Sequence, residues 1–364
     1  MSEYQELLER DGPELLRLKP PVRRAAYSDR TAWQMAVLAE LAYVKFEAPN
    51  DGLLAELAQE LAEIDSVDNI AKRLISLREI LKTPSAGAED RLRAALQVAG
   101  FVLVGTFYNQ TLDPMQNTEG FVAKKIDGEG ADFAVLSIRG TTSIPDWINN
   151  ANVGLESVGG GRLVHKGFHK AFKDAEEQIR ELLSKVDELP LFITGHSLGG
   201  AVAVMATWYF KRDTLAACYT FGGPRAGNHA LNDAFHTPIY RVVNAFDPVP
   251  MVPPTERAIA STKFALRLLS KFGGSIVLDP VIKWLTSIQG YRHAGDLRQM
   301  TDGEMDSHGR YPTVKHFTQF GLAERFARAA KLLTSNQLKR LDVYHNMATY
   351  RRKLRSRALG RAPQ

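Results

Sequence analysis

Hydrophobic residues recur at helical spacing through the first quarter of the chain. The segment TPSAGA at 83–88 then has the composition of a break between structural units. We therefore predict a helical cap or extension over residues 1–95. The positions that predict it lie three or four apart, on one face of a helix, in two runs: Leu54, Leu57, Leu61 and Ile64, then Ile70, Leu74, Leu77 and Leu81.

Short apolar runs alternate with helical stretches in the rest of the chain. The runs that favour strands are 100–108, 133–138, 191–194, 217–221 and 239–244. Such alternation is typical of an α/β sheet with covering helices. We expect residues 96–364 to form this second, α/β domain.

The composition, 45% hydrophobic and 24% charged over 364 residues, is that of a globular protein. Eight basic side chains and one acidic one lie in residues 337–364, so the net charge of +5 describes this end of the chain. The rest is slightly acidic, which argues against a nucleic-acid-binding protein. The basic run 351–357 is interpreted either as a solvated helix end or as an electrostatic contact with an anionic membrane surface.

One cysteine, Cys218, excludes an intramolecular disulfide and a cysteine-based zinc site. The first ten residues are charged and lack the apolar core of a secretory signal. We therefore expect a cytoplasmic protein, or one exported without a cleaved signal peptide. The uncharged stretch 190–210 contains interior glycines, which argue against a membrane span. No pattern in the sequence indicates an oligomeric state.

The segment 191–210 predicts a strand, a tight turn and a helix. The turn is GHSLGG at 195–200, and glycines on both sides of Ser197 allow the backbone to fold sharply. The serine hydroxyl is then exposed at the turn, beside the amides of a helix N-terminus. This context indicates a nucleophilic serine. The alternative is that the glycines only pack a helix closely on a sheet.

A nucleophilic serine needs a base and a carboxylate that holds the base, in the chain order Ser, Asp, His for this kind of turn. Asp247 follows the predicted strand 239–244 and is the candidate acid; the alternative is a turn-forming aspartate before Pro248. Periodicity does not choose among the histidines that follow: His293, His308, His316 and His345.

Acyl transfer also needs two N–H donors for the developing oxyanion. One is expected from Leu198, directly after the serine. The other must come from a different loop. The best candidate is Thr141, because Gly140 before it allows a tight bend at the end of the strand 133–138.

These residues resemble the class 3 lipases, a family that includes the filamentous-fungal triacylglycerol lipases. The resemblance implies an α/β-hydrolase fold with a mostly parallel central sheet, Ser197 as nucleophile, Asp247 as triad acid, and Thr141 with Leu198 at the oxyanion hole. It spans about residues 118–354 and rests on several strings in matching order: RGT at 139–141 with DW at 146–147, VH-x-GF at 164–168, GHSLGG at 195–200, YTFG-x-PR-x-GN at 219–228, and RVV at 241–243 before D-x-VP at 247–250.

The same resemblance assigns the histidines. YRHAG at 291–295 is similar to a structural strand of the family, whereas HNMATY at 345–350 is similar to the segment that carries the catalytic histidine. His345 is therefore the predicted base and His316 the runner-up. The chain departs from the family pattern in the long separation of Asp247 from His345 and in Tyr344, which replaces the usual aspartate.

A lid over the site is a further implication of the resemblance. The segment 143–150, with Ile144, Trp147 and Ile148, lies where the fungal relatives carry theirs. A second candidate for shaping the acyl site is the insertion at about 255–290, which contains an apolar helical stripe; such a stripe is more often part of a core.

The predicted function is hydrolysis of carboxylic esters of lipids, of the acylglycerol lipase or phospholipase A type, through an acyl-enzyme on Ser197. No metal or organic cofactor is expected, and His165 with His169 is interpreted as structural because the glutamate of a zinc-protease motif is missing. The expected partner is a lipid ester. The alternatives are a catalytically silent lipid- or protein-binding module of the same fold and a soluble short-chain esterase.

Overall fold

The computed structural model describes residues 26–43, 51–64, 69–81, 87–109, 118–126, 132–140, 154–254, 259–261, 290–307, 309–319 and 341–360. Within these ranges an eight-stranded sheet has the order β1-β2-β3-β6-β7-β8-β9-β10. Its strands are β1 (Phe101–Asn109), β2 (Thr118–Lys125), β3 (Phe133–Ile138), β6 (Leu191–His196), β7 (Leu215–Phe221), β8 (Ile239–Asn244), β9 (Asp296–Met300) and β10 (His316–Phe317). Pairing is parallel from β3 to β9 and antiparallel at both edges.

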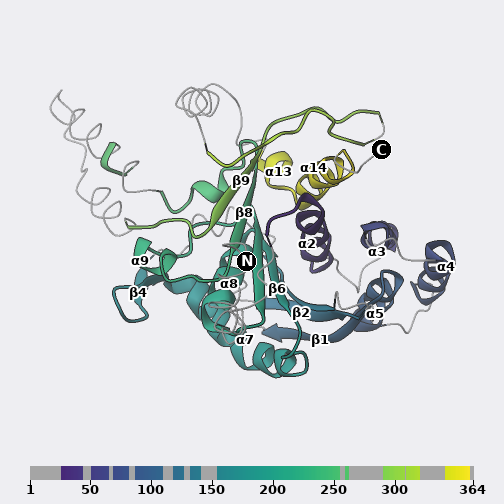
Figure 1. Ribbon diagram of the computed structural model, residues 1–364, viewed down its shortest axis with the longest axis horizontal. Helices are drawn as coiled ribbons and strands as arrows, with labels where there is room; N and C mark the ends of the chain where they lie inside the picture. Colours follow the sequence, from purple (N-terminus) through teal and green to yellow (C-terminus); the bar gives the residue numbers. More distant parts are fainter. Residues whose placement is uncertain are drawn as a thin grey trace, which may run out of the picture.

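Helices cover both faces of this sheet (Figure 1). The first face carries α2 (Asp29–Leu41), α3 (Asp51–Ile64), α4 (Ile70–Leu81), α5 (Ala88–Val98) and α14 (Met347–Leu359). The second carries α7 (Lys166–Ser184) and α8 (Leu198–Tyr209), beside the hairpin β4 (Leu155–Ser157) and β5 (Leu163–His165). The remaining helices of the described ranges are short: α9 (His229–Asn232), the 3₁₀ helix η2 (Val249–Met251) and α13 (Leu341–His345).

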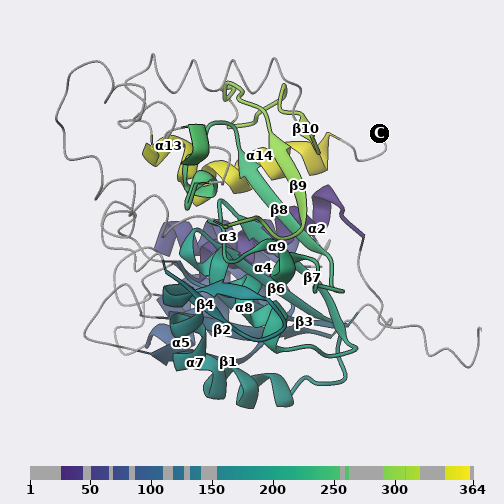
Figure 2. The same ribbon diagram turned by 90° about the vertical axis from the view of Figure 1, so that its left-hand side faces the viewer.

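Each face of the sheet has its own hydrophobic core, because successive side chains of a strand point to opposite faces. In β3, Val135 packs with the N-terminal helices, whereas Leu136 packs with α7 and α8. Figure 2 shows α13 and α14 at the end of the molecule formed by β8, β9 and β10. The last helix therefore lies beside the carboxyl ends of the central strands, where α/β proteins build their sites.

The mostly parallel sheet agrees with the predicted fold class. The strands expected at 133–138 and 239–244 have those bounds, and the other three predicted strands are shifted by one or two residues at an end. The predicted boundary after residue 95 falls inside α5, and α2 to α5 share a core with the sheet. The division into two domains stays a prediction. None of the helices in the described ranges combines the length and apolar content needed to cross a membrane.

Candidate active site

Ser197 occupies a sharp turn between β6 and α8. Its φ of 56° and ψ of −128° are unusual for a residue with a side chain. The glycines beside it permit the turn: a Cβ at Gly195 would lie 2.3 Å from the carbonyl oxygen of Gly199, and one at Gly199 would lie 2.3 Å from that of Ile138. The predicted strand, turn and helix are therefore present, and strain is concentrated at the serine.

Asp247 and His345 form a buried pair. Nδ1 of His345 lies 2.8 Å from Oδ2 of Asp247, and their side chains are 3% and 0% exposed. A carboxylate only accepts hydrogen bonds, so Nδ1 carries the proton and Nε2 keeps its lone pair. That Nε2 is buried and has no hydrogen-bond partner among the described residues. The imidazole is thus set up as a general base with its open nitrogen directed away from the acid.

Three donors hold the Asp247 carboxylate. Besides His345, the backbone N–H of Val249 donates to Oδ1 at 2.9 Å, and the hydroxyl of Tyr350 donates to Oδ2 at 2.5 Å. The Tyr350 oxygen in turn accepts from the N–H of Asn244 at 2.9 Å. The sequence alone does not predict this role of Tyr350. Its place at the end of the string HNMATY, five residues after His345, is the signal that could have found it.

Gly222, at the end of β7, lies where the serine turn and the acid–base pair meet. The N–H of Ser197 donates to the carbonyl of the preceding Phe221 at 2.9 Å. A Cβ on Gly222 would lie 2.7 Å from Asp247 Oδ2 and 3.0 Å from His345 Cε1. Consecutive parallel strands β6, β7 and β8 therefore bring together Ser197, Gly222 and Asp247, which the sequence separates by 50 residues.

His196 joins the nucleophile turn to the base. Its Nε2 lies 2.8 Å from the carbonyl oxygen of His345, and the two rings are 4.5 Å apart between centroids. Burial and the neighbouring His345 lower the pKa of His196 well below its usual range, so this ring is neutral. The sequence alone predicts no role for His196 beyond its place in the GHSLGG string.

Of the two predicted oxyanion donors, Leu198 lies within the described residues. Leu198 is the first residue of α8, so its amide lies at a helix N-terminus, which favours negative charge. Gly140, at the end of β3, packs against this turn: its Cβ would lie 3.2 Å from the amide nitrogen of Gly199. Thr141 lies outside the described residues. So do the lid candidates Ile144, Trp147 and Ile148 and, apart from 259–261, the insertion at 255–289.

The other candidate histidines have different surroundings. His316, the runner-up base, lies on β10 with Nδ1 3.2 Å from Asp29, not beside Asp247. Nε2 of His293 lies 2.6 Å from the carbonyl oxygen of Pro250, and burial lowers its pKa well below the usual range. His308 lies outside the described residues. Among the described histidines downstream of Ser197, the one paired with Asp247 is His345.

The basic run at 351–357 is neither a solvated end nor wholly a surface patch. Arg351 is fully buried in α14 and pairs with Glu40 at 2.7 Å, with Glu56 at 3.0 Å and with Glu60. Arg357 pairs with Asp29 at 3.2 Å. The expectation is wrong for these two side chains, because acidic residues of the N-terminal helices neutralise them inside the protein.

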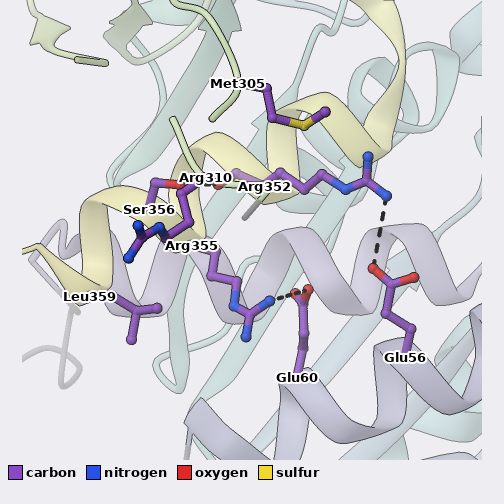
Figure 3. Close-up of a pocket in the computed structure, with 9 residues that line it drawn as sticks. Glu56, Glu60, Met305, Arg310, Arg352, Arg355, Ser356 and Leu359 are labelled. Carbon is purple, nitrogen blue, oxygen red and sulfur yellow. Dashed lines mark hydrogen bonds and ion pairs between the residues drawn. The ribbon is translucent and has the colours of Figure 1, made fainter. Parts of the chain in front are cut away.

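A cavity of about 390 Å³ lies between α14, α3 and the residues Met305, Gly309 and Arg310 (Figure 3). Arg352 and Arg355 extend from α14 toward Glu56 and Glu60 of α3, as the dashed lines in Figure 3 mark. Ser197, Asp247 and His345 do not line it. It is therefore distinct from the candidate active site.

Comparison with known proteins points to one family. The family model "Lipase (class 3)" matches residues 135–257. A secreted mono- and diacylglycerol lipase of Fusarium solani is 37% identical over 130 residues, covering 33% of this chain and 39% of that protein. A chloroplastic phospholipase A(1) of Arabidopsis thaliana is 31% identical over 168 residues, covering 37% and 38%.

The chain thus spans about two fifths of the length of these curated relatives. Among solved structures, a lipase from Rhizopus microsporus var. chinensis aligns with a TM-score of 0.47 and 21% identity, over 79% of this chain and 82% of that one. The family match contains Ser197 and Asp247 and ends before His345.

Proposed function

We propose that this chain, which matches the class 3 lipase family model over residues 135–257, is a serine hydrolase that cleaves carboxylic esters of lipids. The observation that carries the proposal is the buried Asp247–His345 pair together with the strained turn at Ser197. Nε2 of His345 has no hydrogen-bond partner among the described residues. A serine protease or esterase needs this arrangement of acid, base and nucleophile. The names of the Fusarium and Arabidopsis relatives support an acylglycerol or a phospholipid as the substrate.

The proposed reaction begins when Ser197 Oγ attacks the ester carbonyl carbon and its proton moves to Nε2 of His345. The carbonyl oxygen becomes an oxyanion, which the amide of Leu198 and a donor from Thr141 would stabilise. The C–O bond then breaks, and the alcohol leaves with the proton from His345. Water, deprotonated by the same nitrogen, then attacks the acyl carbon. The bond from the acyl carbon to Ser197 Oγ breaks, Oγ takes the proton back from Nε2 of His345, and the carboxylic acid leaves. Asp247 stays ionised and stabilises the imidazolium.

A fluorophosphonate probe tests the nucleophile directly, since it reacts with activated serines. Intact-mass measurement should give one adduct on the wild-type protein and none on Ser197→Ala. His345→Ala should lose ester hydrolysis by several orders of magnitude, whereas His316→Ala, the matched control, should keep it. Equal turnover in Ser197→Ala and the wild type would contradict the proposal.

Substrate class separates the proposal from its two alternatives. A lipase or phospholipase should hydrolyse defined long-chain acylglycerols or phospholipids, and its rate should rise above the solubility limit of the substrate. A soluble esterase should prefer short-chain esters and have no such rise. A silent binding module should bind lipid without releasing fatty acid and without reacting with the probe.

We also propose that the substrate is met at an anionic lipid surface. Arg352 and Arg355 support this, because 42% and 40% of their side chains stay exposed although they pair with Glu56 and Glu60. Arg351, by contrast, is fully buried. Binding to vesicles containing an anionic phospholipid should weaken as salt is raised and in the variant Arg352→Gln/Arg355→Gln. Salt-independent binding would contradict this part of the proposal.

A further inference from the structure

Tyr43 brings the N-terminal helical region to the candidate active site. It lies two residues after the end of α2, and its ring packs on that of His196 at 5.5 Å between centroids. Its hydroxyl lies 3.0 Å from Nδ1 of His196. It also contacts Gly140, because a Cβ on that glycine would lie 2.2 Å from the phenol oxygen. One hydroxyl group thus touches the ends of both β3 and β6.

The hydrogen bonds of His196 fix the direction of each proton. A carbonyl oxygen only accepts, so Nε2 of His196 must donate to the carbonyl of His345. His196 is neutral, so its other nitrogen, Nδ1, is an acceptor. The Tyr43 hydroxyl is therefore the donor to Nδ1 at 3.0 Å, and the carbonyl oxygen of His196, at 3.3 Å, is a second acceptor of the same hydrogen. The Tyr43 oxygen keeps lone pairs for the backbone N–H of Gly140; burial raises the pKa of Tyr43, and this hydrogen bond opposes the rise. The result is a directed chain from Tyr43 through His196 to His345.

This chain reaches each proposed catalytic element. Gly140 precedes the predicted oxyanion donor Thr141, and His196 precedes the nucleophile Ser197 in sequence. The His196 ring contacts the ring of His345, the proposed base, with 4.5 Å between centroids and the planes tilted by 34°. Because Tyr43 contacts the ends of both β3 and β6, it limits the distance between them. The proton on Nε2 of His196 lets this ring donate a hydrogen bond to the backbone carbonyl of His345.

We infer that Tyr43 and His196 are positioning residues, which hold Gly140, the serine turn and the base His345 in one arrangement. This inference rests on the proposed function. Neither residue touches the reacting atoms in the proposed reaction; each acts through the groups that it holds. A shift of about 1 Å in such groups lowers the rate of a step by about 100-fold, without a matching change in ground-state binding.

The test is Tyr43→Phe in the full chain, with Tyr27→Phe as the matched control. Both substitutions remove one phenol hydroxyl near an end of α2, but Tyr27 Oη bonds Asp29 and His316, outside the site. With a soluble p-nitrophenyl ester, Tyr43→Phe should lower kcat by about 10- to 100-fold and change KM by less than about 2-fold. Tyr27→Phe should leave both parameters unchanged. Equal kcat in the two variants would overturn the inference.

A second variant keeps the test decisive if Tyr43→Phe is poorly folded. His196→Asn retains an acceptor for Tyr43 but loses the donor to His345, and the inference requires the same fall in kcat at unchanged KM. Normal kcat in a folded His196→Asn variant would overturn it.

Nitrogen-15 NMR of the histidine rings provides a readout that does not depend on turnover. Wild-type His196 should carry its proton on Nε2, with the Nδ1 resonance moved in Tyr43→Phe and unmoved in Tyr27→Phe; a proton on Nδ1 would overturn the inference. Failure of the proposed function is recognised separately, because the wild-type protein itself would then hydrolyse no ester and bind no fluorophosphonate.

Discussion

Gly222→Ala adds a single methyl group at the point where the acid, the base and the serine turn meet. The new Cβ would lie 2.7 Å from Asp247 Oδ2, 3.0 Å from His345 Cε1 and 3.0 Å from Tyr350 Oη, in a backbone with a φ of +60°. A left-handed conformation costs a residue with a side chain about 1–2 kcal/mol. Overpacking of a tight interior costs about 1–3 kcal/mol more. The free energy of unfolding should therefore fall by about 2–5 kcal/mol.

The same methyl group should reduce activity in the molecules that stay folded. Relief of these contacts requires Asp247 or His345 to move by about half an ångström or more, so kcat on a soluble ester should fall about 10- to 100-fold. The control is Gly159→Ala, where φ is +87° but no atom lies within 4 Å of the added Cβ. It should lose only the 1–2 kcal/mol of backbone strain and keep its kcat.

Urea unfolding and steady-state kinetics on the three proteins decide the matter. If Gly222→Ala has the kcat of the wild type and loses no more stability than Gly159→Ala, the crowding around Gly222 does not constrain the acid–base pair. That result would refute the tight contact of Gly222 with Asp247 and His345 as a determinant of the site's geometry.

Three further predictions concern neighbouring groups. Tyr350→Phe removes one of three donors to Asp247, so kcat on a soluble ester should fall by about 10-fold and the free energy of unfolding by about 1–3 kcal/mol; unchanged values would mean that the third donor is dispensable. Arg351→Met leaves its glutamate partners buried without their cation and should lower the free energy of unfolding in urea by about 3–5 kcal/mol. Arg352 is half-exposed, so Arg352→Met should lower it by less than about 0.5 kcal/mol. Equal losses in the two variants would contradict this prediction. His165→Asn keeps a side-chain acceptor at the N-terminus of α7 but cannot titrate. Burial lowers the pKa of His165 from 6.5 to about 4. Between these two pH values the unfolded chain binds a proton that the folded chain does not. The free energy of unfolding therefore falls as the pH falls, by about 3 kcal/mol at most. The variant should lose less stability between pH 7 and pH 4.5 in urea titrations, and equal losses would contradict the assignment.

Local patterns were enough to predict the parts of the site that are built from consecutive residues. The string around Ser197 determines its strand, turn and helix together, because Gly195 and Gly199 are needed at contacts too close for any side chain. Asp247 follows a buried strand that an apolar run reveals. The strands that the apolar runs do not predict are β2, β4, β5, β9 and β10. β4 and β5 have three residues each and β10 has two; β9 reads DLRQM, and β2 reads TEGFVAKK, with polar residues at both ends. Their place in a sheet comes from pairing with neighbours, which periodicity does not record.

The choice of the base required long-range information. His345 lies 98 residues after Asp247, and neither periodicity nor chain order separates it from His293 or His316. The resemblance to a family supplied the choice that the residues alone left open. The structure adds the physical reason for the difference: Nε2–H of His293 donates a hydrogen bond to the carbonyl oxygen of Pro250, and His316 pairs with Asp29, so neither ring is bonded to Asp247.

The charge of the C-terminal segment also gave a wrong expectation, because the partners of its arginines lie far away in the sequence. The end of the chain is basic as a segment, but the acids that neutralise Arg351 are Glu40, Glu56 and Glu60, about 300 residues earlier. Once paired, these charges fix α14 against α2 and α3. Because α14 begins two residues after His345 and carries Tyr350, the N-terminal helices support the proposed acid–base pair from one side, and Tyr43 supports the serine turn from another. The helical region predicted as a separate cap therefore contributes to the geometry of the site, and its removal should cost activity as well as stability.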